Sequence, residues 1–313
     1  MAGNALTSYP ARGYVLLTGV AFGWGVNWPF MKIIVSEVSV WEFRALTGIA
    51  AGLLLLGLAV AVGGSSGEAW KPPRAEWPRL CLAALFNITS WFVLIGFGVS
   101  MMGAGHAVIM AFTMPLFAAV FGVLALGEAM TRRRIAALAF GAAGVAVLMS
   151  HDFSVIGAEP LGFALTLAGA ALWAVGVLIQ KHTPWQIGVV ALGGWQILLG
   201  SAPIVAIWLV LGSFDYGDAG AAVWWSTAYL VLIALVFCYF AWFTVVKIFP
   251  ASVSAIGTLM VPVIGFVSGV VVLGEPFGLR DLIALALIVG AVALVLLVPP
   301  GDPVAGRRAP GPR

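Results

Sequence analysis

The chain has 313 residues, of which 62% are hydrophobic and only 9% are charged, and its formal net charge is +3. A soluble domain carries roughly 25% charged residues, so this chain has too little polar surface to cover an apolar core in water. Composition therefore excludes a soluble globular protein and indicates an integral membrane protein. The two cysteines, Cys81 and Cys238, both lie in apolar runs, so neither a disulfide framework nor a metal site is expected.

The first apolar run follows a short N-terminus and continues to about residue 34. It exceeds the roughly 7–15 residues of a secretory signal core, and we interpret it as the first membrane span. A span needs about 20 apolar residues to cross the hydrocarbon. Ten runs are interpreted in this way, namely 13–34, 40–62, 78–98, 103–126, 134–150, 160–180, 187–211, 225–246, 251–273 and 279–298. The remaining segment, 299–313, is rich in Pro, Gly and Arg, and we predict a disordered tail.

One phrase of the sequence occurs twice, with its two copies 147 residues apart. The copies are Pro115, Gly122, Gly127, Glu128 and Arg133, and then Pro262, Gly269, Gly274, Glu275 and Arg280. An internal duplication of this kind predicts two homologous units. We therefore expect one five-helix repeat in 1–150, a second in 151–298, and the tail in 299–313.

The basic residues predict how the chain is oriented. With the N-terminus in the cytoplasm, twelve of the 15 Lys and Arg residues lie inside, and only Lys32, Arg44 and Arg280 lie outside, which follows the positive-inside rule. Five spans separate the two copies of the phrase, so the halves are inverted relative to each other. Inverted repeats are typical of secondary transporters. The expected fold is an all-α membrane protein, with ten transmembrane helices in two inverted five-helix repeats and both termini in the cytoplasm.

Charged chemistry is absent from the middle of the predicted spans. Every acidic residue lies in a loop or near the end of a span, so no buried carboxylate is expected to couple transport to protons or to bind a cation. The chain has no P-loop pattern, metal-ligand cluster or paired carboxylates, so we expect neither an enzyme nor a cofactor or metal. Hydroxyl, amide and backbone groups would then have to bind any zwitterionic substrate.

Aromatic and uncharged polar residues occupy the interior instead. Trp24, Trp91 and Trp173 lie deep in their spans, where tryptophan gains nothing from the membrane interface, and they either line a cavity or pack between helices. The candidate substrate-binding residues are Trp24, Asn27, Asn87, Ser90, Trp91, His106, Trp173, Tyr239 and Thr258. For His106 the alternative is a hydrogen-bonded histidine at a helix end. Aromatic walls with a few amides and hydroxyls suit an apolar or aromatic metabolite.

The repeated phrase itself contains two kinds of residue. Pro115 and Pro262 fall about midway along their spans, where proline breaks one backbone hydrogen bond. We predict a hinge or kink at each, either beside a central cavity or used only for packing. The Gly-Glu and Arg members are expected to stabilise the hairpins between spans.

These features together resemble a known family. Two five-span halves with a repeated Pro…Gly…Gly-Glu pattern are similar to the EamA-type branch of the drug/metabolite transporter superfamily. Within that branch, the stretch from Gly23 to Pro29 and the aromatic content resemble bacterial aromatic amino acid and methyl viologen exporters. The resemblance implies export across the bacterial inner membrane by alternating access, with the site between the halves.

We therefore expect an exporter of aromatic and other neutral amino acids that works by facilitated diffusion. It would act as a monomer in the lipid bilayer, on a small-molecule substrate and without nucleic acid. Two alternatives stay open. One is an exporter of cationic or apolar drugs such as methyl viologen, which would use cation–π contacts with the tryptophans. The other is a structural or lipid-handling membrane protein with no soluble substrate.

Overall fold

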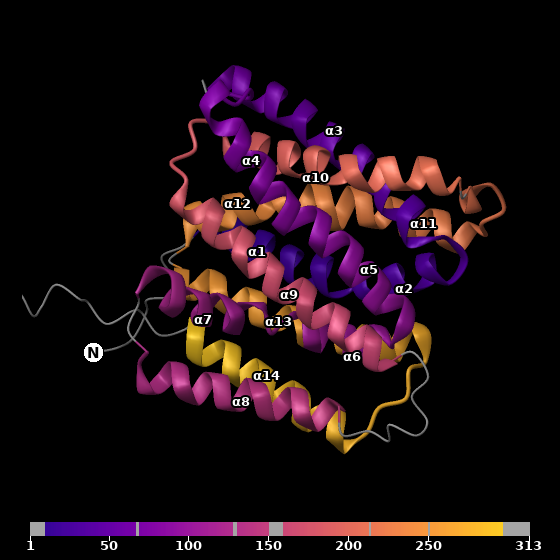
Figure 1. The fold of residues 1–313 in the computed structure, drawn as a ribbon, viewed down its shortest axis with the longest axis vertical. Helices are drawn as coiled ribbons and strands as arrows, with labels where there is room; N and C mark the ends of the chain where they lie inside the picture. Colours follow the sequence, from indigo (N-terminus) through magenta and orange to yellow (C-terminus); the bar gives the residue numbers. More distant parts are fainter. Residues whose placement is uncertain are drawn as a thin grey trace, which may run out of the picture.

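The computed structural model describes residues 10–66, 69–127, 130–149, 159–212, 214–249 and 251–296, which are mostly helical (Figure 1). One helix, or a run of helices, occupies each of the ten predicted ranges, with ends that differ by a few residues. Six described segments are long and apolar enough to cross a membrane, namely Val40–Ala61, Arg74–Met101, Ala104–Ala125, Pro160–His182, Val189–Leu211 and Ala221–Trp242. A shorter apolar helix covers Thr258–Leu273. The protein is an all-helical, multi-pass membrane protein.

Three of the predicted spans in the first half are interrupted. The elements in chain order are α1 (Ala11–Gly25), α2 (Asn27–Glu37), α3 (Val40–Ser66), the short turn η2 (Arg74–Glu76), α4 (Trp77–Ala84), the π-helical η3 (Leu85–Ser90), α5 (Trp91–Met101), α6 (Ala104–Ala111), α7 (Met114–Leu126) and α8 (Arg132–Met149). The first predicted span is thus α1 and α2, the third is α4, η3 and α5, and the fourth is α6 and α7.

The second half repeats this order with fewer interruptions. Its elements are α9 (Glu159–His182), α10 (Val189–Leu211), the short turn η4 (Asp215–Gly217), α11 (Ala221–Tyr229), the π-helical η5 (Leu230–Phe237), α12 (Cys238–Ile248), α13 (Ala251–Leu273) and α14 (Leu279–Leu296). Both α9 and α13 are continuous where α1–α2 and α6–α7 are divided.

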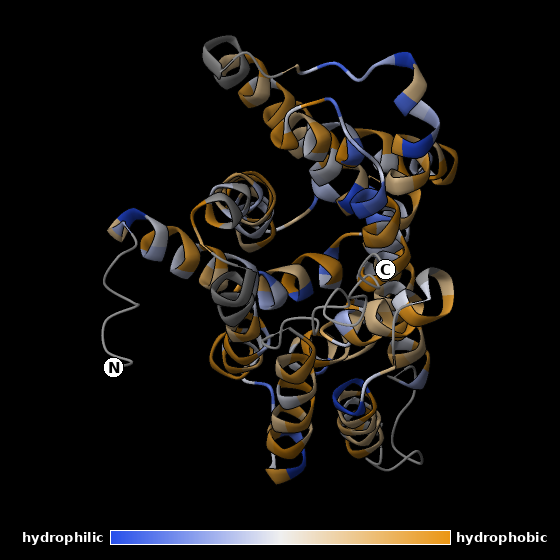
Figure 2. Ribbon diagram, turned by 90° about the vertical axis from the view of Figure 1, so that its left-hand side faces the viewer, coloured by the Kyte–Doolittle hydropathy of each residue, from blue (hydrophilic) through white to orange (hydrophobic). Residues whose placement is uncertain are grey.

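Helices from the two halves are interleaved. In Figure 1, α3 and α10 lie side by side near one end of the long axis and α8 and α14 near the other, and both pairs are in contact. The helix α1 packs on α12 and α13, while α9 packs on α5, η3 and α7. The first span of each half therefore packs on the third and fourth spans of the other. Figure 2 shows apolar residues along the helices and hydrophilic residues mainly at helix ends and in connections.

The bundle has two ends, at which the connections between helices lie. The end with the turn between α5 and α6 is called the α5–α6 end, and it lies on the right in Figure 1. The opposite end is where α9 finishes at His182. The helix α9 runs between them, because Gly162 near its start approaches Met101 while Gly176 further along approaches Asn87.

Glycine ends three of the helices in the way expected from backbone geometry. Gly127, Gly212 and Gly274 follow α7, α10 and α13 with φ of +66°, +67° and +66°. This left-handed conformation is strained for residues with a Cβ and is the common C-terminal stop for a helix. Gly127 and Gly274 are equivalent members of the repeated phrase, so the phrase twice ends a span with the same turn.

The two π-helical stretches also occupy equivalent places. The last residues of η3 and η5, Ser90 and Phe237, are 147 residues apart, which is the offset of the repeated phrase. A π-helix widens one turn and changes which face the following residues present, and such turns are frequent at functional sites. Trp91 comes directly after η3 and Tyr239 is the second residue after η5. Both are candidates for the substrate site.

The loops of each half are fastened to the other half at both ends of the bundle. At the α5–α6 end, the backbone N–H of Ser39 donates to Asp215 Oδ2 at 2.7 Å. At the opposite end, the N–H of Gly188 donates to the carbonyl of Ala69 at 2.9 Å. Ser39 and Gly188 each directly precede a helix, α3 and α10, at equivalent positions of the halves. These two contacts do not distinguish one end from the other.

Candidate aromatic site between the halves

Four predicted residues form two matching aromatic contacts. The ring centroids of Trp24 and Tyr239 lie 6.0 Å apart, and those of Trp91 and Trp173 lie 6.1 Å apart. Trp24 and Trp173 lie 149 residues apart in the chain, and Trp91 and Tyr239 lie 148 apart, so Tyr239 is one residue beyond the equivalent of Trp91 at the offset of the π-helices. The first span of each half therefore makes an aromatic contact with the third span of the other half. All four side chains are only partly buried.

The π-helix η5 holds Trp24 in place. The indole Nε1–H of Trp24 donates to the carbonyl of Ala234 at 2.9 Å, and the hydroxyl of Tyr229 donates to the carbonyl of Gly23 at 3.1 Å. Trp242 adds a third ring, 5.9 Å from Trp24. This hydrogen bond fixes the orientation of the Trp24 ring, and the face of the ring can still contact a ligand.

A cluster of three amides lies beside the Trp91–Trp173 contact. Asn87 Nδ2 donates to Gln180 Oε1 and to Gln196 Oε1, both at 3.0 Å, and Gln196 Nε2 donates to Gln180 Oε1 at 3.3 Å. Asn87 precedes Trp91 by four residues and Gln180 follows Trp173 by seven, so both lie on the η3–α9 contact. Sequence reasoning named Asn87 but missed Gln180 and Gln196. Gln180 is the last residue of its predicted span, where polar side chains are ordinary, whereas Gln196 lies well inside its predicted span and could have been recognised from that position.

Two buried amide oxygens lack a partner among the described residues. Asn87 Oδ1 faces the backbone of Gly176, and Asn27 Oδ1 lies at the start of α2, directly after the interruption at Val26. Leaving a buried acceptor unpaired costs roughly 1–3 kcal/mol. Asn27 is therefore available to a hydrogen-bond donor that the chain itself does not supply.

The remaining polar candidates are less informative. Ser90 uses its hydroxyl on the carbonyl of Leu85 within η3, at 2.9 Å. Thr258 lies partly buried in α13, four residues before Pro262. Neither belongs to the aromatic contacts described above, so their part in substrate binding stays a prediction.

His106 makes an interhelical ion-pair contact. Its Nε2 lies 3.1 Å from Asp281 Oδ1 on α14, and its ring lies 6.2 Å from the ring of Phe163. The other ring nitrogen, Nδ1, is buried and has no partner among the described residues. This geometry agrees with the alternative of a hydrogen-bonded histidine at a helix end, near the start of α6.

The two repeated prolines lie in different local structures. Pro115 is the second residue of α7, because α6 stops at Ala111 and the helix restarts after Thr113. Its missing N–H costs nothing in a first turn. Pro262 instead lies inside the continuous helix α13. The fourth span of the first half is therefore divided, whereas its equivalent in the second half is not.

The expectation that the interior carries no charge is wrong for Arg44. Its side chain is 4% exposed, and Nε donates to the carbonyl of Phe92 at 3.0 Å while Nη2 approaches Met31 Sδ at 2.7 Å. The guanidinium also lies 4.4 and 4.8 Å from the ring centroids of Phe43 and Phe92. The residue was assigned to an outer loop because it lies close to the start of its span.

Glu275 of the repeated phrase does not act within its own hairpin. Its Oε1 accepts from the N–H of Ala104 at 2.6 Å and its Oε2 from the N–H of Gly105 at 2.9 Å, so it caps α6 of the other half. The predicted stabilisation of a helix N-terminus by this carboxylate is present, but on a different helix from the one expected. Glu128 of the first copy lies outside the described residues.

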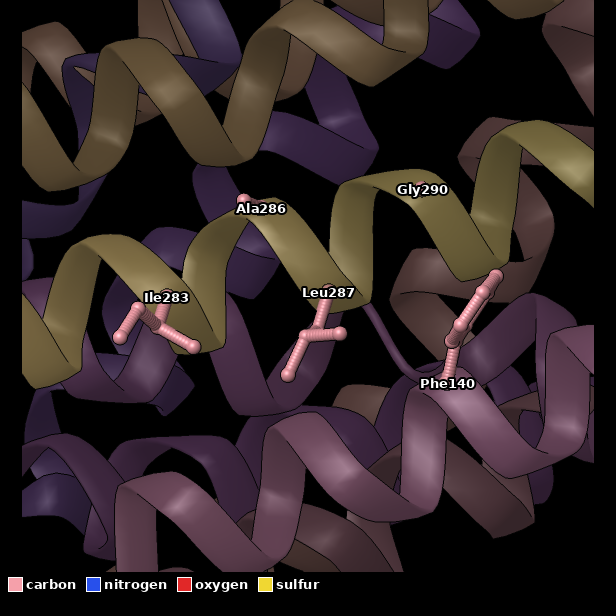
Figure 3. A pocket seen from close by; sticks show the side chains of 5 residues that line it. All are labelled: Phe140, Ile283, Ala286, Leu287 and Gly290. Atoms are coloured by element: carbon pink, nitrogen blue, oxygen red, sulfur yellow. The ribbon is translucent and has the colours of Figure 1, made fainter.

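An apolar groove on the molecule lies away from all these residues. It has a volume of about 340 Å³ between α8 and α14, and Phe140, Ile283, Ala286, Leu287 and Gly290 line it (Figure 3). None of these side chains can orient a polar substrate, so the groove is not the candidate site. Among the described residues, no group of three or more His, Cys, Asp and Glu side chains could hold a metal ion.

A multi-pass helical bundle whose two related halves contact each other is typical of membrane transporters built from internal repeats. Comparison with known proteins gives the particular family. The model of the EamA-like transporter family matches residues 11–150 and 160–297. The chain therefore belongs to this family, within the drug/metabolite transporter superfamily.

Individual relatives agree with the family. An uncharacterized transporter of Bacillus subtilis is 30% identical over 91% of this chain and 91% of its own length. A protein of Escherichia coli named "Probable amino-acid metabolite efflux pump" is 29% identical over 64% of this chain and 69% of its own length. A crystal structure with 20% identity has a TM-score of 0.63 and covers 90% of this chain and 96% of that one, which shows the same fold.

Proposed function

We propose that the protein exports amino acids, aromatic and other neutral ones, across the bacterial cytoplasmic membrane. It would cross the membrane ten times as two inverted five-helix halves, 1–150 and 151–298, with both termini in the cytoplasm. The name of the Escherichia coli relative supports an amino acid substrate. No chemical conversion of the substrate is part of this function, so the protein would be a transporter and not an enzyme.

The observation that carries the proposal is the pair of matching aromatic contacts, Trp24–Tyr239 and Trp91–Trp173. Each joins the halves at the end of a π-helical stretch, so relative movement of the halves would move the aromatic walls. Ring faces favour apolar and aromatic side chains, and the Asn87–Gln180–Gln196 cluster provides amides for an amino or carboxylate group. Neutral hydrogen bonds give modest affinity, which suits efflux down a metabolite gradient.

The test is counterflow of labelled amino acids in proteoliposomes, with and without an imposed proton gradient. We expect uptake of Phe, Trp or Leu without the gradient. Absence of counterflow for all twenty amino acids, or transport only with the gradient, would contradict the proposal.

Variants of the aromatic contacts sharpen this test. Trp91→Ala and Trp173→Ala should each raise KM roughly threefold to tenfold, because a ring-to-ring contact is worth about 0.5–1.5 kcal/mol. Trp225→Ala is the matched control, since Trp225 is 77% exposed in the middle of α11. Equal changes in KM for all three variants would show that the aromatic contacts do not bind the substrate.

A drug exporter is the second candidate, because partly exposed tryptophan faces also attract cations. Competition in the same liposomes separates the two functions. Methyl viologen that inhibits amino acid counterflow shares the site. Methyl viologen transported in the absence of any amino acid counterflow would favour the drug exporter.

A further inference from the structure

The turn between α5 and α6 is held from both sides by charged side chains. Lys32, on α2, lies on one side, and Glu275, from the segment between α13 and α14, lies on the other. Lys32 belongs to the first half of the chain and Glu275 to the second. Glu275 therefore joins the second half to the α5–α6 turn, while Lys32 joins the same turn to α2 within the first half.

Lys32 caps the end of α5. Its Nζ donates to the carbonyls of Val99, Ser100 and Met102 at 2.8, 3.1 and 2.9 Å. The last carbonyls of a helix have no partner within the helix and carry the negative end of its dipole. A cation at this point both satisfies them and is stabilised by them.

Glu275 caps the start of α6 through two charge-assisted hydrogen bonds, as described above. The rest of the repeated phrase makes this reach possible. Gly274 turns the chain with its left-handed φ, and a Cβ at Gly269 would lie 2.8 Å from Glu275 Oε2. On the receiving side, Cβ atoms at Gly103 and Gly105 would lie 3.2 and 3.3 Å from the same carboxylate. Glycines at 103, 105 and 269 thus leave the space that the carboxylate fills.

The opposite end of the bundle differs at the equivalent of Lys32. Lys181 occupies that position with an offset of 149, and its side chain is exposed at the end of α9. The main neighbours of α9 all belong to the first half, whereas α2 packs both on α11 and α13 of the second half and on α5 and α6 of its own. By contrast, the Ser39 and Gly188 contacts are present at both ends. Lys32 and Lys181 therefore differ in their surroundings, although the loop contacts beside them match.

The two halves also differ in where their helices are interrupted. The first half is interrupted at Val26 and at Phe112–Thr113, while α9 and α13 are continuous at the equivalent positions. Inverted repeats open one side of the membrane and close the other when their two copies of the same fold adopt different conformations. The two halves of this chain differ in that way.

We infer that Lys32 and Glu275 form a clamp on the α5–α6 turn that holds this end of the transporter closed, and that the clamp releases when this end opens. The inference rests on the proposed export, carried out by the alternating access that the family resemblance implies. It gives the Glu of the second repeated phrase a gating role in place of a hairpin role. The predicted orientation of the chain makes this the outer gate.

The clamp can be tested by measuring the opening of this end directly. Spin labels at Ser36 and Phe277, which are exposed residues of the two halves at this end, report their separation in a background with Cys81→Ser and Cys238→Ala. Glu275→Gln and Lys32→Met should each shift the distances to longer values, with the open fraction raised about tenfold, because each loses charge-assisted caps. Glu128→Gln, Lys181→Met and Asp218→Asn remove matched charges, and they should leave this end closed.

A third variant separates the position of the carboxylate from its charge. Gly269→Ala keeps Glu275 ionised but places a methyl group where the carboxylate lies, and it should also open this end. Unchanged distances in folded Glu275→Gln, Lys32→Met and Gly269→Ala proteins would overturn the inference. Loss of folding in all three would overturn it too, since a clamp that releases in each cycle cannot be required for folding. The measurement uses no substrate, so a failure to transport amino acids would not affect it.

Discussion

The guanidinium of Arg44 is buried between the rings of Phe43 and Phe92, and its hydrogen bonds go to a carbonyl and a thioether. No carboxylate lies within ion-pair distance of it among the described residues. A planar cation is suited to this place, because it can stack on a ring while its edge donates hydrogen bonds. Arg44 therefore fastens α3 to α2 and α5 by its shape as much as by its charge.

Substitution of Arg44 tests this reading. We expect Arg44→Lys to lower the free energy of unfolding by about 2 kcal/mol, because an ammonium keeps the cost of burial but loses the stacked plane. Arg44→Met should cost less, since an apolar side chain removes the buried charge. Thermal unfolding in detergent, followed by tryptophan fluorescence, gives the order. A Lys variant as stable as the original protein would show that charge alone matters.

At the scale of elements, close contact between helices depends on particular glycines. The helix α9 approaches the π-helix η3 at Gly176, where a Cβ would lie 2.1 Å from Asn87 Oδ1 and 2.9 Å from the Asn87 backbone nitrogen. The Asn87 backbone cannot move away from a Cβ at position 176 as a flexible side chain could. Gly57 in α3, by comparison, has no atom within 4 Å of the position of a Cβ.

These two glycines form a matched pair for mutagenesis. Gly176→Ala should destabilise the protein by about 1–3 kcal/mol through overpacking, and it should disturb the amide cluster. Gly57→Ala should be neutral or stabilise by up to roughly 1 kcal/mol, because alanine is the better helix former. The melting temperatures of the two variants, measured under the same conditions, test this difference in stability. Equal melting temperatures would show that the α9–η3 contact is looser than the structure indicates.

The helices were predictable because crossing a membrane demands long apolar runs, and each predicted range is helical here. Trp24 and Trp173 were recognisable as equivalents from their spacing alone. Other features have no local signal. The π-helices follow from how η3 and η5 pack, and Glu275 meets α6 about 170 residues away in the chain. Arg44 and Gln180 lie near span ends, where a sequence cannot distinguish a buried polar side chain from a solvated one, whereas Gln196 lies inside α10 and could have been named.

At the scale of the whole molecule, the uneven distribution of Lys and Arg predicts both termini in the cytoplasm. A green fluorescent protein fused to the C-terminus should therefore fluoresce, and alkaline phosphatase fused there should be inactive. The reverse result would invert the chain in the membrane. The α5–α6 end would then face the cytoplasm, and the clamp would be an inner gate.

A clamp at one end has a consequence for the energetics of the transport cycle. Lys32 caps a helix at one end of the bundle, whereas its equivalent Lys181 is exposed at the other end. Such a difference makes the outward-facing and inward-facing states unequal in free energy, so the unloaded protein is mostly in one of them. Substrate meeting the less populated state binds with an apparent affinity reduced by that population. Microscopic reversibility nevertheless leaves the direction of net flux to the concentration gradient. Lys32 and Glu275 would thus set the side on which the carrier rests, and how soon it saturates there, without deciding which way amino acids flow.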